Sequence, residues 1–131
     1  SAILFDRLAD INWAGFYLVD NSIDNSKKEL GLGPFQGQPA CSRIPIGKGV
    51  CGTAVSTAKI QLGDDVHSFD GHIACDAASN SEVVIPIIVN DEVVAVLDID
   101  SPIHARFDQD DANGLMEIVQ FLQSSWPATK R

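Results

Sequence analysis

EVVIPIIVNDEVVAVLDID, residues 82–100, contains two strongly apolar runs separated by Asn90 and Asp91. Both separating residues tolerate positive φ, so the stretch predicts a hairpin with a tight two-residue turn. Both faces of each run are apolar, and we therefore expect two central strands that are covered on both sides.

The rest of the chain supplies further elements around this hairpin. Pro34 suggests a bulge or an edge in the strand that contains it. The patterns predict the end of a helix at 6–10, strands at 11–20, 29–37 and 41–46, a short helix within 47–59, an extended piece at 60–66, a long ordered loop at 67–81 and a helix at 109–126. Consecutive hairpins favour an α+β fold whose antiparallel sheet has helices on one side and loops on the other.

Size and composition restrict the function. The 131 residues, 45% of them hydrophobic, fit one domain spanning 1–131. A net charge of −9 argues against a nucleic-acid partner, and it neither requires nor excludes a homodimer. The chain has no stretch of 18 uncharged apolar residues and no signal-peptide pattern, so we expect no membrane span and a cytoplasmic location.

Two acids on the last strand of the hairpin are candidates for proton transfer. Asp98 and Asp100 follow Val94 and Val96 on one strand face, and they lie roughly 7 Å apart at the usual strand rise. If both face one pocket, their repulsion raises the pKa of at least one and makes a proton donor available. The alternative is that both are solvated where the strand ends.

The three cysteines are too few for a disulfide-stapled secreted domain. In a reducing cytosol they are free thiols, metal ligands or redox-active groups. Cys75 lies three residues after His72, so a thiolate–imidazolium pair is one interpretation and an inert core thiol is the other. A zinc site from Cys41, Cys51, His72 and Cys75 is conceivable, but no C-x₂-C pair supports it, and we expect no metal.

Two aromatic residues share one face of the first strand. Core packing is the default for Trp13 and Tyr17. If they occupy the same sheet face as Asp98 and Asp100, they form an aromatic wall opposite carboxylates, which suits a small amphiphilic cation such as an amino acid.

Four segments together resemble a known family: INWAGFYLV, LGPFQGQPACSRIPIGKGVCGTAV, DVHSFDGHIACDAASNSEVVIPI and VLDIDSP. They resemble the free methionine-(R)-sulfoxide reductases, which are single GAF domains, from about Asn12 to Phe121. The resemblance implies a sheet of about six antiparallel strands with a loop-capped ligand pocket on one face. It also implies that an N-terminal helix is missing or shortened.

The resemblance also assigns the candidate residues. Cys75 corresponds to the thiol usually taken as the nucleophile and Cys41 to its usual disulfide partner. Cys51 is the third thiol, and some members have been argued to use it for the attack instead. The remaining positions match the substrate-binding carboxylates and the aromatic wall: Glu82, Asp98, Asp100, Trp13 and Tyr17.

The implied reaction reduces free methionine-(R)-sulfoxide and so repairs oxidative damage. A thiolate attacks the sulfoxide sulfur, the oxygen must be protonated to leave, and a carboxyl group with a raised pKa supplies that proton. The resulting sulfenic acid condenses with a second thiol to a disulfide. A thioredoxin-like partner, supplied by NADPH and thioredoxin reductase, reduces that disulfide, and no cofactor is bound. The alternative is a GAF module that senses a small ligand without chemistry.

One geometric point tests the role of Glu82. A regular hairpin with a two-residue turn pairs Val83 with Asp98, which sends Glu82 to the opposite face. The resemblance needs Glu82 to converge with Asp98 and Asp100. We therefore predict a three-residue turn or a bulge near Pro86.

Overall fold

The computed structural model describes residues 8, 10–20, 29–37, 43–45, 49–63 and 80–126. Within these ranges the elements are β1 (Trp13–Asp20), β2 (Glu29–Gly37), β3 (Arg43–Pro45), α2 (Gly49–Thr57), β4 (Gln61–Gly63), β5 (Ser81–Val89), β6 (Glu92–Ser101) and α3 (Gln109–Ser124). The predicted helix end at 6–10 and most of the predicted loop at 67–81 lie outside the described residues. No helix in the described part of the chain is long and apolar enough to cross a membrane.

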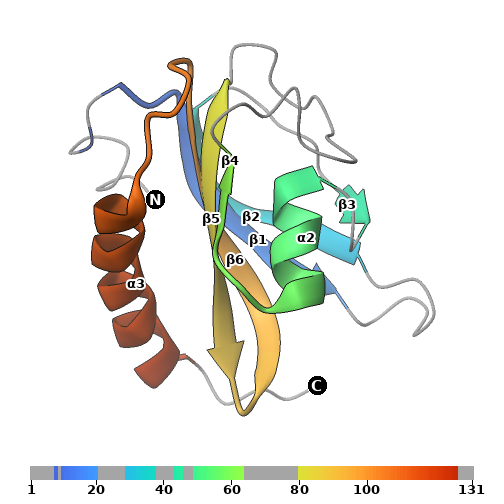
Figure 1. The fold of residues 1–131 in the computed structure, drawn as a ribbon. Helices are drawn as coiled ribbons and strands as arrows, with labels where there is room; N and C mark the ends of the chain where they lie inside the picture. The colour runs from blue at the N-terminus through green and yellow to red at the C-terminus, as the bar shows by residue number, and fades with distance from the viewer. Residues whose placement is uncertain are drawn as a thin grey trace.

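The strands form one six-stranded sheet in the order β3-β2-β1-β6-β5-β4 (Figure 1). Every neighbouring pair is antiparallel. The hairpins β1–β2 and β5–β6 meet at the β1–β6 pair, so both strands of the opening stretch lie inside the sheet. The α+β class, the antiparallel sheet and the central hairpin are therefore confirmed.

The predicted irregularity at Pro34 is a bulge. Gly15 pairs with Phe35 and Tyr17 pairs with Leu32, so β2 carries one more residue than β1 between these pairs. Pro34 sits in this bulge, beyond the residues of β2 that pair with β3, and no ladder hydrogen bond needs the N–H that proline lacks.

Each face of the sheet carries its own hydrophobic cluster. On one face α3 packs over the sheet, with Leu115 and Val119 against residues such as Ile85 and Leu97. On the other face α2 packs over Val84 and Val96. The helices are thus divided between the two faces, as Figure 1 shows, and the expectation that they share one side is wrong for α2. The reason is that the chain crosses to the face opposite α3 and α2 buries its own apolar residues there, Val50 and Ala54, against the sheet.

The N-terminus of α3 is fixed by a capping box. The Asp108 side chain accepts from the Asp111 N–H at 2.9 Å, and the Asp111 side chain accepts from the Asp108 N–H at 3.0 Å. These reciprocal bonds satisfy backbone donors that the helix itself leaves unpaired. The hydrogen bond from Asp111 also lowers the pKa of Asp108.

Candidate functional site

Six of the predicted site residues fall within the described ranges, and they lie together on the sheet face that α2 covers. Trp13 and Tyr17 come from β1, Glu82 from β5, and Cys51 from the first turn of α2. Asp98 and Asp100 come from β6. The aromatic residues and the carboxylates therefore share one face, which is the condition that the aromatic wall required.

Glu82 reaches this face because of a bulge in β6. Asn90 and Asp91 form the two-residue turn with φ of 54° and 64°. Ile88 then pairs with Val93 but Ile87 pairs with Ala95, so Val94 is an extra residue. The shift places Glu82 directly opposite Asp100. The predicted irregularity is confirmed, one residue away from Pro86.

The bulge has two further consequences. Val94 packs against the cluster on the α3 face, so its predicted place on the Asp98 face is wrong. The N–H of Ile88, next to the shift, donates to Oε1 of Gln123 on α3 at 2.9 Å. A helix side chain therefore satisfies a backbone donor at the point where the strand ladder is irregular.

Cys51 and two carboxylates converge closely. The Cys51 thiol donates to Glu82 Oε2 at 3.7 Å. One ligand atom each from Cys51, Glu82 and Asp98 lies within 4.8 Å of the other two. Cys51 and Asp98 are both only 4% exposed, so their interaction takes place away from bulk water.

Asp98 favours its protonated form. Burial raises the pKa of Asp98 well above its ordinary value, and the negative charges of Asp100 and Glu82 raise it further. Its Oδ1 atom is buried and accepts no hydrogen bond. Asp98 therefore has the properties of a buried proton donor.

The same environment keeps the Cys51 thiol and the Tyr17 hydroxyl neutral. Burial, followed by the charges of Asp98 and Glu82, raises the pKa of the Cys51 thiol. Burial and the Asp98 charge also raise the pKa of the Tyr17 hydroxyl. Cys51 is consequently a thiol and hydrogen-bond donor in this arrangement, because a thiolate there is penalised twice.

The aromatic wall contains one residue that sequence reasoning missed. Trp13 stacks on Tyr17 with ring centroids 5.7 Å apart, and it also stacks on Phe35 at 5.5 Å. Phe35 lies opposite Gly15, where a Cβ atom would come within 2.5 Å of the Phe35 Cβ. The signal was a glycine between two aromatic residues on one strand and an aromatic residue on the next, and it becomes readable only once the register is known.

Several predicted residues are not placed. Cys41, Cys75 and His72 lie outside the described residues, and so does the proposed loop cap. The alternative zinc site combined these residues with Cys51, so most of its ligands also lie outside the described ranges.

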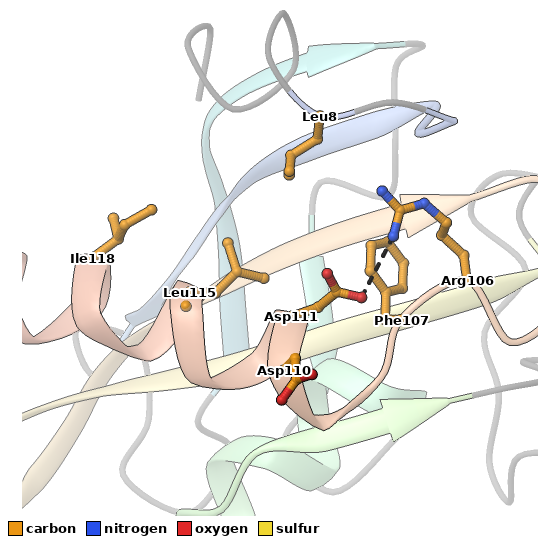
Figure 2. A pocket seen from close by; sticks show the side chains of 8 residues that line it. Leu8, Arg106, Phe107, Asp110, Asp111, Leu115 and Ile118 are labelled. Atoms are coloured by element: carbon orange, nitrogen blue, oxygen red, sulfur yellow. Dashed lines mark hydrogen bonds and ion pairs between the residues drawn. The ribbon is translucent and has the colours of Figure 1, made fainter.

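A separate cavity of about 310 Å³ lies beside α3, on the opposite side of the sheet from the predicted site (Figure 2). Arg106 pairs with Asp111 at 3.4 Å and lies over the Phe107 ring. The cavity is lined by Leu8, Arg106, Phe107, Asp110, Asp111, Gly114, Leu115 and Ile118. None of the predicted site residues is among them.

Comparison with known proteins identifies the class. A family model of the GAF domain matches residues 2–123. Together with the six-stranded antiparallel sheet, this match defines a GAF domain.

Relatives narrow the class further. The free methionine-R-sulfoxide reductase of Escherichia coli K12 is 55% identical over 123 residues, covering 94% of this chain and 71% of that protein. The reduced form of fRMsr of Staphylococcus aureus matches with a TM-score of 0.89 and 54% identity, over 97% of this chain and 79% of that one. The free methionine-R-sulfoxide reductase from Neisseria meningitidis, in complex with its substrate, matches with a TM-score of 0.87 and 42% identity. This match covers 94% of this chain and 71% of that one.

The chain belongs to the GAF domain family and, within it, to the free methionine-R-sulfoxide reductases, a group of oxidoreductases. The resemblance stated from the sequence is thereby confirmed.

Proposed function

We propose that this protein reduces free methionine-(R)-sulfoxide to methionine. The observation that carries the proposal is the convergence of Glu82, Asp98 and Cys51 within 4.8 Å on the face that holds Trp13 and Tyr17. This combines a site for a cation, a buried proton donor and an apolar wall. The names of the Escherichia coli and Neisseria meningitidis relatives support the same substrate.

In this proposal the carboxylates divide into two roles. Glu82 and Asp100 lie directly opposite each other and hold the α-ammonium group of the free amino acid. Asp98, whose pKa is raised by burial, donates a proton to the sulfoxide oxygen. A peptide bond at the ammonium nitrogen removes the charge that Glu82 and Asp100 recognise, and free substrate is therefore preferred to protein-bound substrate.

The apolar part of the substrate lies against the aromatic wall. Trp13 and Tyr17 are buried and stacked, so they offer a rigid surface to the methyl and methylene groups of the side chain. The R preference is carried over from the relatives' names.

The electrons come from two thiols. The thiolate of Cys75 attacks the sulfoxide sulfur and takes its oxygen, so the substrate becomes the sulfide and Cys75 becomes a sulfenic acid. The Cys41 thiol then attacks the sulfenic sulfur, a disulfide forms, and the oxygen leaves as water. A thioredoxin-like dithiol reduces this disulfide by exchange, and NADPH and thioredoxin reductase restore the dithiol.

Cys51 takes a different part in the proposal. Its burial and its carboxylate neighbours raise its pKa, which supports Cys75 rather than Cys51 as the attacking group. Cys51 contributes a hydrogen-bond donor next to Glu82. Thioredoxin as the reductant, a cytoplasmic location and a homodimer stay predictions.

The test is turnover of free L-methionine-R-sulfoxide, its S epimer and the N-acetyl R form, followed by NADPH loss with thioredoxin and separately with a small dithiol. We expect turnover of the free R form alone, its loss in Cys75→Ser, and a strong decrease in Asp98→Asn. Asp110→Asn, which changes an exposed carboxylate on α3, is the matched control and should keep full activity. Binding of the sulfoxide with no turnover under either reductant would instead support the ligand-sensing alternative.

A further inference from the structure

Three potential metal ligands from three different elements meet on the face of the sheet that α2 covers. Cys51 lies in the first turn of α2, Glu82 is the second residue of β5, and Asp98 lies well inside β6. One ligand atom of each is within 4.8 Å of the other two. Within the described ranges no other group of three His, Cys or acidic residues comes together in this way.

The spacing is close to that of a coordinated ion. Zinc binds thiolate sulfur at about 2.3 Å and carboxylate oxygen at about 2.1 Å, so tetrahedral angles put the two ligand atoms ~3.6 Å apart. The distance from Cys51 Sγ to Glu82 Oε2 is 3.7 Å. These two atoms therefore need almost no movement to bind one ion, and Asp98 needs only a small one. The Cys51 thiol and the Asp98 carboxyl each release a proton to solvent as the ion binds.

A second observation points to a ligand at the same place. Asp98 is 4% exposed, and its Oδ1 atom accepts no hydrogen bond. A buried carboxylate oxygen without a partner is costly, and a bound cation removes that cost. Glu82 pairs with Asp100 across the two strands, and paired residues point to the same face of a sheet. Asp98 is two residues before Asp100 on β6, so it points to that face as well.

The ligand atoms select the kind of metal. Mg²⁺ and Ca²⁺ prefer oxygen ligands alone, whereas Zn²⁺ accepts sulfur and oxygen together in a four-coordinate site. Three protein ligands leave the fourth position to water, which is the arrangement of an open zinc site rather than a closed structural one.

We propose that Cys51, Glu82 and Asp98 form a binding site for a thiophilic divalent cation of the Zn²⁺ type. The ion uses Glu82, to which the proposed function assigns the substrate ammonium group, so metal and substrate exclude each other and the metal inhibits the reductase. This exclusion rests on the proposed function, but the binding of the metal does not.

Binding is measured with Zn²⁺ alone against a chromophoric chelator, on the full chain carrying Cys41→Ser and Cys75→Ser so that Cys51 is the single remaining thiol. We expect one equivalent of Zn²⁺. Adding Cys51→Ser, Glu82→Gln or Asp98→Asn weakens Zn²⁺ binding by at least ~10–100-fold. Loss of a residue that only contacts a metal ligand already weakens binding by about this factor. Asp110→Asn leaves the affinity unchanged. Equal affinity in the Cys51→Ser variant and this control overturns the proposal.

X-ray absorption of the loaded protein gives an independent answer. We expect one sulfur at about 2.3 Å and oxygen ligands at about 2.0–2.2 Å, and a spectrum without sulfur refutes the site. If the Cys41→Ser/Cys75→Ser background does not fold, the wild-type chain is loaded with Co²⁺ and compared with Cys51→Ser, which should lose thiolate-to-metal absorption. An unchanged absorption in that variant contradicts the proposal.

The outcomes separate the two proposals. Zn²⁺ binding at Cys51 with no reductase activity under any reductant refutes the proposed function and keeps the metal site. Reductase activity in a protein that binds no Zn²⁺ refutes the metal site and keeps the proposed function. Activity inhibited by Zn²⁺, with the inhibition relieved by excess substrate, supports both.

Discussion

Gln123 on α3 should control the stability of the β6 bulge, although it is far from the predicted site in sequence. Its Oε1 accepts the Ile88 N–H at 2.9 Å, next to the extra residue that puts Glu82 opposite Asp100. Gln123→Met keeps the length of the side chain and removes the acceptor. The Ile88 N–H is part-buried, so the substitution leaves a backbone donor without a partner.

The magnitude follows from the lost hydrogen bond. Leaving a buried donor unsatisfied costs about 1–3 kcal/mol. Unfolding entropy is about 2.1 cal/mol/K per residue, which over 131 residues gives roughly 0.28 kcal/mol/K. We therefore expect Tm to fall by ~4–11 °C in a calorimetric scan.

The matched control is Gln120→Met, the same change at an exposed position of the same helix. It should shift Tm by less than ~2 °C, because surface substitutions stay within about 0.5 kcal/mol. If the bulge loosens, Glu82 is held less firmly and KM for the sulfoxide should rise more than kcat falls. Equal Tm values for the Gln123 and Gln120 variants would refute the reasoning that α3 holds the bulge.

Three further predictions concern packing and charge. Gly15→Ala adds a Cβ 2.5 Å from the Phe35 Cβ, so we expect about 1–3 kcal/mol of destabilisation in urea unfolding. Its control Gly114→Ala adds a methyl group in open space on a helix and should stabilise by ~0.5–1 kcal/mol, so equal effects of the two would contradict the packing argument. Burial raises the pKa of folded Asp98, so the wild-type free energy of unfolding should decline as pH rises from about 3.9 through that raised pKa. Asp98→Asn should not show this decline. Parallel curves of unfolding free energy against pH for the two proteins would disprove the argument. The hydrogen bond from the Asp111 N–H lowers the pKa of Asp108, so Asp108→Ala should lower Tm at neutral pH. The Tm difference between wild type and variant should disappear as pH falls below that lowered pKa. A Tm difference that persists in strong acid would count against the capping role.

Most helices and strands of this fold could be predicted from the amino-acid pattern alone. Apolar runs on both sides of Asn90–Asp91 placed the central hairpin, because strands buried on both faces need apolar residues at every position. The helical spacing of Leu115, Ile118, Val119 and Leu122 placed α3. Leu115 and Val119 form its buried face, whereas Ile118 is exposed. Alternation also put Asp98 and Asp100 on one face of their strand and Trp13 and Tyr17 on one face of theirs, since that period is a local property of the backbone.

The position of Glu82 and of α2 on these faces depends on contacts between residues that are far apart in the chain. The family resemblance required an irregularity for Glu82 but did not locate it at Val94. A bulge depends on pairing across strands and, here, on the contact of Gln123 with Ile88. The position of α2 on the face opposite α3 depends on how the chain crosses the sheet. The bulge and the position of α2 together bring Cys51 close to Glu82 and Asp98. Burial at this place raises the pKa values of Cys51 and Asp98, and burial depends on the folded structure rather than on neighbours in the sequence.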